Sequence, residues 1–240
     1  MNVAIDIGNT RTKIGLFNGP EIVSSTAFEM ADLQSVLQWV EQQQPAAVIL
    51  SSTVDIPKEL LAAVSRIPRY IILDQYTSLP FSNHYKSKDT LGKDRIALVA
   101  AANSRFPHQN NLVIGCGTCI TFNFINASNE FLGGSIHPGL KMRLKAMHHF
   151  TGKLPDVELS ESADLIGTDT FSNMMTGTLY AAAREIDGMI NEYLVKFPQM
   201  NIIITGGDAD LLVSRLKNEI FANPDCTLIG LNHILQHNAQ

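Results

Sequence analysis

Residues Gly115–Phe124 read GCGTCITFNF, and the loop that this stretch forms decides the fold. A dinucleotide-binding loop requires a third glycine and a following helix. Here position 120 is Ile, and Ile120, Phe122 and Phe124 alternate with polar residues, which indicates a strand. The remaining interpretation is a strand, a tight turn at Gly117-Thr118, and a second strand.

The two cysteines in this stretch, Cys116 and Cys119, form a CxxC pattern. A redox CxxC opens a helix and exposes a reactive thiolate at its N-terminus, but a strand follows here. A zinc site needs four ligands, and the sequence has no second CxxC. We therefore interpret both cysteines as small buried side chains.

A similar turn is expected near the N-terminus, where Asp6–Lys13 reads DIGNTRTK. Gly8 and Asn9 tolerate positive φ, and a tight turn of this kind points backbone N–H groups at one spot, which can bind an anion. Asp6 ends its strand, where it can hold a metal-bound water. A plain hairpin with a solvated lysine accounts for the same residues. Further donors to a phosphate would be Thr10, Thr12 and Lys13.

A third glycine motif, ITGGDA at Ile204–Ala209, follows the pattern of a strand, two glycines and a helix. Gly206 and Gly207 would allow the backbone to approach a ligand closely, for example the nucleoside part of a nucleotide. A simple strand-to-helix turn is the alternative.

The order of elements repeats along the chain. The first half is expected to contain strands over 3–7, 12–17, 22–28, 46–50 and 70–73, and helices over 31–43, 57–65 and 91–103. The second half is expected to contain strands over 112–114, 120–125, 130–136, 202–205 and 227–229, and helices over 138–150, 168–196 and 208–217. This pattern predicts an α/β fold with two similar domains, 1–108 and 109–240, facing each other across a nucleotide cleft.

Composition narrows the functional class. The chain has 240 residues, 45% hydrophobic and 17% charged, which is typical of a globular protein with a sizeable core. A net charge of −5 without a basic stripe argues against nucleic acid as the main partner. Apolar runs are too short for a membrane span. No signal peptide is expected, and three cysteines suggest reduced thiols, so we expect a cytoplasmic protein.

The ordered set DIGNTRTK, LGKDR, GTCITFN, LGGSIHPG and ITGGDA resembles type III pantothenate kinases, which belong to the acetate-and-sugar-kinase, heat-shock-ATPase and actin superfamily. The resemblance runs from residue 2 to about residue 213, and its most specific parts are DxGNTxxK and GxDR. It implies two ribonuclease-H-like domains of the actin-like ATPase type and a homodimer. It also implies ATP-dependent phosphorylation of pantothenate to 4′-phosphopantothenate, the first step of coenzyme A biosynthesis, with Mg²⁺ and a monovalent cation, K⁺ or NH₄⁺.

The resemblance also implies roles for individual residues. Asp94 would be the catalytic base, although a carboxylate at a helix start is also favoured by the helix dipole alone. Arg95 would hold the carboxylate of pantothenate, although a surface ion pair is an alternative. Residues implied to bind ATP are Asp6, Ile7, Gly8, Asn9, Thr10, Arg11, Thr12, Lys13 and Thr118. Residues implied to bind pantothenate are Tyr85, Gly92, Lys93, Asp94, Arg95 and, across the dimer interface, Thr170.

The chain departs from the family pattern DxGTAxTxD in its second loop. Gly115 stands where the family has the aspartate that helps to bind the monovalent cation, and Asn123 replaces the last aspartate. Glycine cannot supply a carboxylate, so that site is either missing or rebuilt from backbone carbonyls and water. A catalytically weak relative with a regulatory or interaction role is therefore an alternative function, and a kinase for another small hydroxy acid or sugar is a third.

Overall fold

The N-terminal hairpin expected from the sequence is present in the computed structural model, which describes residues 1–239. Strands β1 (Asn2–Ile7), β2 (Arg11–Asn18) and β3 (Glu21–Glu29) pair antiparallel. Strands β4 (Ala47–Ser52) and β5 (Arg69–Ile72) continue the sheet in parallel with β1, giving the order β3-β2-β1-β4-β5. These strands confirm the sequence-based expectation for the first half.

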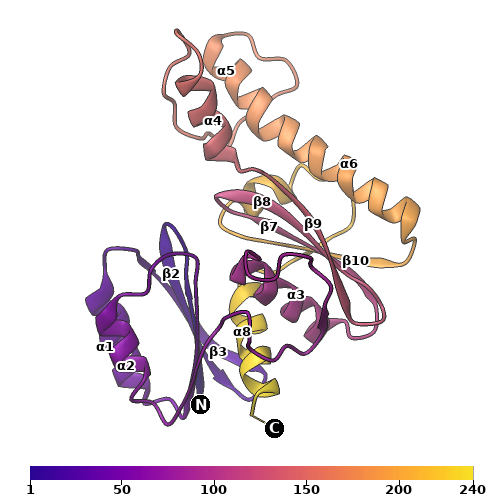
Figure 1. Cartoon of the computed structure of the whole chain (residues 1–240). Helices are drawn as coiled ribbons and strands as arrows, with labels where there is room; N and C mark the ends of the chain where they lie inside the picture. Colours follow the sequence, from indigo (N-terminus) through magenta and orange to yellow (C-terminus); the bar gives the residue numbers. More distant parts are fainter. Residues whose placement is uncertain (240) are drawn as a thin grey trace. The chain divides into compact units, whose positions relative to one another are not determined.

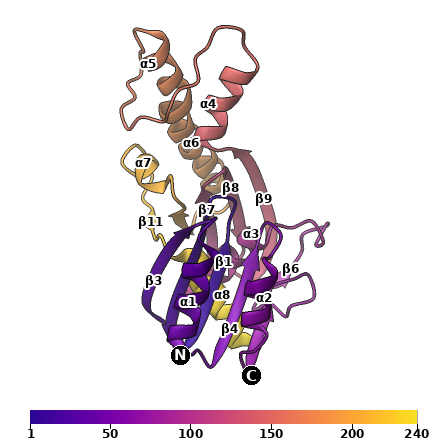
Figure 2. The same ribbon diagram turned by 90° about the vertical axis from the view of Figure 1, so that its left-hand side faces the viewer.

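Alternation along β1 gives this sheet two buried faces. Val3, Ile5 and Ile7 pack with helices α1 (Leu33–Gln43) and α2 (Lys58–Val64). The alternate residues of β1 face the other side of the sheet. On that side α8 (Cys226–His237) packs against β1 and against α3 (Lys93–Arg105). Figures 1 and 2 show α1 and α2 on one side of the sheet and α8 on the other.

The second sheet repeats the order of the first. Strands β7 (Asn110–Cys116), β8 (Cys119–Ile125), β9 (Glu130–Pro138), β10 (Met200–Thr205) and β11 (Phe221–Ala222) are arranged as β9-β8-β7-β10-β11, with β6 (Ser82–Asn83) beside β9. The first sheet has the same order, β3-β2-β1-β4-β5, so β7 corresponds to β1, β8 to β2, β9 to β3, β10 to β4 and β11 to β5. The duplication inferred from the glycine turns is confirmed.

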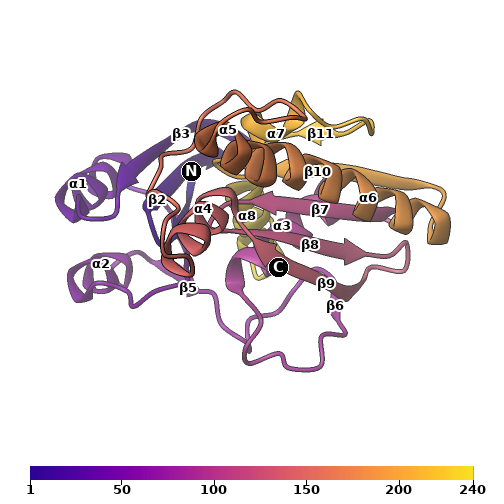
Figure 3. The same cartoon turned by 90° about the horizontal axis from the view of Figure 1, so that it is seen from above.

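Helices connect and cover the second sheet. They are α4 (Leu140–His149), α5 (Thr170–Met175), a π-helical turn (Thr176–Tyr180), α6 (Ala181–Lys196) and α7 (Ala209–Val213). Helix α6 runs along one face of the sheet (Figure 3), and its buried residues pack against apolar residues of β7, β8 and β10. None of the helices described over residues 1–239 is long and apolar enough to cross a membrane.

The described residues divide into two compact units, and the division differs from the predicted domains. Unit 1 comprises 1–108, 125–132 and the chain from Asp225 on, and unit 2 comprises 109–124 and 133–224. The expected strand at 227–229 is wrong, because these residues lie within α8. Since α8 packs against β1 and α3, the end of the chain belongs to the first unit and not to a domain spanning 109–240.

Helices α3 and α8 approach each other closely at a glycine. Gly230 is buried in α8, and a Cβ atom there would collide with the backbone carbonyl of Ala97 in α3. The helix pair that covers the first sheet therefore requires a residue without a side chain at this crossing.

We expect Gly230→Ala to lower the free energy of unfolding by about 3 kcal/mol, because the helices must separate to make room. Gly188→Ala is the matched control, since Gly188 is exposed in α6 and a Cβ there meets nothing within 4 Å. That variant should be neutral or more stable by up to ~1 kcal/mol, because alanine favours helix. Urea unfolding measures both, and equal stabilities for the two variants would contradict the packing argument.

Candidate active site

Three polar residues lie side by side on adjacent strands of unit 1. Asp6 on β1 is opposite Lys13 on β2 and opposite Ser51 on β4. All three are at the carboxyl end of β1, on the face where α3 and α8 pack. Ligands of open α/β sheets bind at the carboxyl ends of strands, so this trio marks a candidate site.

The carboxylate of Asp6 is held in an unfavourable environment. The residue is half-buried, while its Oδ1 atom is shielded from solvent and makes no hydrogen bond with the described residues. Burial, followed by the charge of Asp94, raises the pKa of Asp6 from 3.8 to about 7, against the lowering effects of Lys13 and Ser51. A perturbed carboxyl next to a second carboxyl is typical of a functional site.

Asp94 is placed by the start of helix α3. Gly92 is the N-cap of this helix, and Asp94 lies in its first turn. A Cβ atom at Gly92 would lie 2.5 Å from Asp94 Oδ1, so the glycine leaves room for the carboxylate to turn back over the helix start. The structure therefore brings Asp94 close enough to Asp6 for each charge to act on the other.

The neighbouring residue, Arg95, is buried, with only 4% of its surface exposed. Its guanidinium Cζ lies 5.5 Å from the ring centre of Tyr85 and 6.0 Å from that of Phe131. The two rings stack with their centres 6.1 Å apart. Arg95 is therefore not the surface residue considered as an alternative, and cation–π contacts to two stacked rings help to orient it inside unit 1.

The β1–β2 turn is tight, but it does not use the positive φ that its sequence allows. Gly8 N donates to Arg11 O over 3.0 Å, while positive φ in the described residues is confined to other positions than Gly8 and Asn9. Ile7 and Thr12 are buried, and Ile7 packs with the apolar residues of α1 and α2. Arg11 forms an exposed ion pair with Glu29, 3.5 Å apart.

The corresponding turn in unit 2, Gly117-Thr118, joins β7 to β8. Thr118 is exposed, and Gly117 N donates to Cys119 O over 3.0 Å. Gly139, the N-cap of α4, donates its N–H to Thr118 O over 3.2 Å, and a Cβ at Gly139 would collide with the carbonyls of Gly117 and Thr118. The turn thus rests directly on the start of α4.

The glycine pair of ITGGDA packs on the protein backbone itself. Gly206 has φ +109°, and a Cβ there would collide with the backbone of Cys116. This close approach explains Gly206 without a ligand, whereas Gly207 is exposed with open space around it. Burial, with a smaller effect from Asp208, raises the pKa of Cys116 to about 12, which disfavours its thiolate. Cys116 is buried as interpreted from the sequence, whereas Cys119 is only half-buried.

The monovalent-cation position lacks the expected ligands. Gly115 pairs with Thr205 of β10 and has no side chain. Asn123 is fully buried and its Nδ2 donates to Val113 O and to Thr121 Oγ1, both over 3.2 Å. Among residues 1–239 no group of three or more His, Cys, Asp or Glu side chains is placed to hold a metal ion. The side chains therefore do not fit a carboxylate-based cation site.

Sequence reasoning missed Ser51 and Phe131 as parts of this site. Ser51 carried a signal, since AVILSS becomes polar where a buried parallel strand ends beside Asp6. Phe131 carried none, because its contact with Arg95 joins segments far apart in the sequence. Thr170, the remaining predicted residue, is exposed at the first position of α5 in unit 2.

Two units with the same five-strand order, each with a glycine turn between its first two strands, form a duplicated α/β fold of the ribonuclease-H-like type. A Baf family protein from Campylobacter jejuni has a similar structure, with a TM-score of 0.65 at 20% identity over 99% of this chain and 98% of that one. An activator of 2-hydroxyisocaproyl-CoA dehydratase from Clostridium difficile, with bound ADPNP, gives a TM-score of 0.59 at 12% identity over 99% and 95%.

Sequence comparison shows the family to which the chain belongs. The family model for type III pantothenate kinase matches residues 2–192. The type III pantothenate kinase of Cytophaga hutchinsonii is 40% identical over 99% of this chain and 100% of its own length. The chain belongs to the type III pantothenate kinase family.

We expect the stability of Asp6→Asn relative to wild type to increase with pH. The folded state favours the protonated form of Asp6. The stabilisation that this protonated carboxyl gives to the wild type is complete below pH 3.8 and is lost as the pH rises through about 7. Asparagine has no such loss, and the difference in unfolding free energy should grow by up to about 4 kcal/mol between pH 4 and pH 8. Urea unfolding across this range tests it.

The background Asp94→Asn serves as the control for this titration. Removing the neighbouring charge should lower the pKa of Asp6 and shrink the pH-dependent difference. A difference that does not change with pH would mean that Asp6 is not perturbed.

Proposed function

We propose that this chain transfers the γ-phosphoryl group of ATP to the primary hydroxyl of pantothenate, with Asp94 as general base. The observation that carries this proposal is that Asp94, in the first turn of α3, lies near enough to Asp6 for its charge to act on that carboxyl, with Lys13 opposite Asp6 on the neighbouring strand. Membership of the type III pantothenate kinase family supports ATP as donor and pantothenate as acceptor, and places the reaction in coenzyme A biosynthesis.

Asp94 and Arg95 would act on the two ends of pantothenate. An ionised carboxylate near the hydroxyl can take its proton as the bond to phosphorus forms. The buried guanidinium of Arg95 can bind the carboxylate of pantothenate with two hydrogen bonds. Tyr85, stacked on Phe131 next to Arg95, would form a wall of this subsite.

The phosphates of ATP would be held by backbone groups and by Lys13. The Gly8–Thr10 turn follows β1 directly, and Lys13 adds a positive charge beside it. Thr118 at the corresponding turn of unit 2 would contribute a second contact. ADPNP bound to the structural relative from Clostridium difficile agrees with nucleotide binding in this fold.

A divalent cation fits the same site. Mg²⁺ usually keeps several waters and takes one or two carboxylates together with substrate phosphates. Asp6, with a buried Oδ1 that lacks a hydrogen bond among the described residues, would hold it directly or through water. When bound, Mg²⁺ would neutralise charge on the transferring phosphate.

A homodimer with Thr170 near the partner's site is part of this proposal, as is a cytoplasmic location. The homodimer is supported by a set of exposed apolar side chains on or beside α4 and α5 of unit 2. These two helices pack together through Leu144 and Met174. Exposed apolar residues of this kind favour association. They are Met142, Phe150, Leu165, Ile166 and Phe171.

We expect Asp94→Asn to reduce kcat by about 10²- to 10⁴-fold, as for loss of a general base, with little change in KM for ATP. Pantothenate-dependent ADP release measures it. Asp89→Asn, which removes an exposed carboxylate five residues earlier, is the control and should keep wild-type turnover. A folded wild type that binds ATP without pantothenate-dependent turnover would favour a regulatory or interaction role. Turnover with another hydroxy acid or sugar would favour a kinase for a different substrate.

We expect turnover to be the same with K⁺, NH₄⁺ or neither, because Gly115 and Asn123 supply no carboxylate for a monovalent cation. ADP release in buffers of tris or another large organic cation, with and without each salt at constant ionic strength, measures this. A rate that rises saturably with K⁺ would show a site built from backbone carbonyls.

A further inference from the structure

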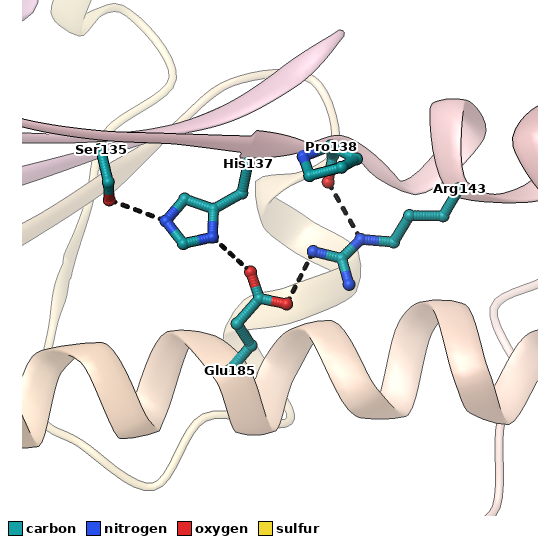
Figure 4. Close-up of polar contacts among 5 residues, drawn as sticks. All are labelled: Ser135, His137, Pro138, Arg143 and Glu185. Carbon is teal, nitrogen blue, oxygen red and sulfur yellow. Dashed lines mark hydrogen bonds and ion pairs between the residues drawn. The ribbon is translucent and has the colours of Figure 1, made fainter.

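A chain of polar contacts in unit 2 lies outside the residues given a role above. Ser135 Oγ lies 2.7 Å from His137 Nε2, and His137 Nδ1 lies 2.5 Å from Glu185 Oε1. The second oxygen of Glu185, Oε2, accepts from Arg143 at 2.8 Å. Figure 4 shows these side chains converging from strand β9 and helices α4 and α6.

The contacts define which atom of the histidine ring carries its proton when the ring is neutral. A carboxylate only accepts, so Nδ1–H of His137 donates to Glu185, and Nε2 accepts from the hydroxyl of Ser135. The ring also packs against Phe122, with the centres 5.0 Å apart. His137, Glu185 and Arg143 expose 19%, 32% and 18% of their side chains, so the network is largely shielded from solvent.

The connectivity is that of a hydrolase triad, but two observations point to a different role. Glu185 also forms an ion pair with Arg143, so its charge is shared and stabilises an imidazolium less. Ser135 lies inside β9, two residues from His137 on the same face, and not at a sharp turn that would present its hydroxyl to a substrate.

The network fixes the junction between β9 and α4. Arg143 Nε donates to Pro138 O over 3.0 Å, so Glu185 contacts the end of β9 directly at His137 and, through Arg143 of α4, at Pro138. Gly139 follows immediately, and its N–H donates to Thr118 O. Because a Cβ at Gly139 would collide with the Gly117 and Thr118 carbonyls, this contact is close enough to transmit a small displacement of the junction.

We propose that His137, Glu185 and Arg143 are positioning residues for the Gly117-Thr118 turn. They hold the Pro138-Gly139 junction against that turn, and thereby set how well it binds the phosphates of a nucleotide. The inference rests on the proposed role of Thr118 in ATP binding. Binding by such a turn is sensitive to displacement because its groups must match the phosphate oxygens in position.

The test is calorimetric titration of the full chain with Mg²⁺ and a non-hydrolysable ATP analogue, and separately with adenosine. His137→Ala should raise the Kd for the analogue on the order of tenfold and leave the Kd for adenosine unchanged, because adenosine has no phosphates. His137→Asn should recover most of the affinity, since its amide N–H can still donate to Glu185. Glu185→Gln, which keeps an acceptor but loses the charge facing Arg143, should give an intermediate Kd.

The control is His148→Ala, which removes a histidine of α4 that is bonded to Leu154 O, and it should not change either Kd. Unchanged analogue affinity in both His137→Ala and Glu185→Gln would overturn the proposal, and so would parallel loss of analogue and adenosine affinity with a lowered Tm. The readout does not use pantothenate, so a wild type that binds the analogue but fails to phosphorylate pantothenate would refute the proposed function alone. A wild type that binds neither ligand would refute both.

Discussion

The cost of burying the Asp6 carboxylate is the constraint on which the first unit depends. Asp6 lies on the central part of the sheet, between Lys13 on β2 and Ser51 on β4, so it cannot move to solvent without disrupting two strand pairs. Burial, followed by the charge of Asp94, outweighs the effect of Lys13, and the pKa of Asp6 remains raised. A cation bound beside Asp6 would therefore stabilise the folded state.

Close backbone contacts at glycines organise the second unit. Gly134 has φ +154°, and a Cβ there would collide with the carbonyl of Phe122, so β9 can lie against β8 only with a glycine at that position. Gly139 and Gly206 make equally close contacts with the Gly117-Thr118 turn and with Cys116. The glycine motifs that were interpreted from the sequence as ligand-binding loops therefore also serve to pack the backbone of unit 2. Their effect on a ligand is indirect, because they determine where the turn lies.

Local patterns predicted most of the fold, whereas contacts between distant segments did not follow from them. The hairpins and the repeat were predictable because glycine turns and alternation are local signals. Residues 227–229 looked like a strand because a short apolar run fits either element; α8 forms because Gly230 lets it pack on Ala97 of α3. In the site, the family motifs gave Asp6 and Asp94, but no local signal predicted that Phe131 contacts Arg95.

The two departures from the family pattern in the second loop are chemically consistent with each other. The fully buried Asn123 in β8 donates two hydrogen bonds from Nδ2, and an aspartate there would lose both and bury a charge. Gly115, at the end of β7, is uncharged too. With no carboxylate at either position, these two residues do not add to the repulsion of a triphosphate. The electrostatic reason for recruiting a monovalent cation at these positions is therefore weaker, since there is less negative charge for it to offset.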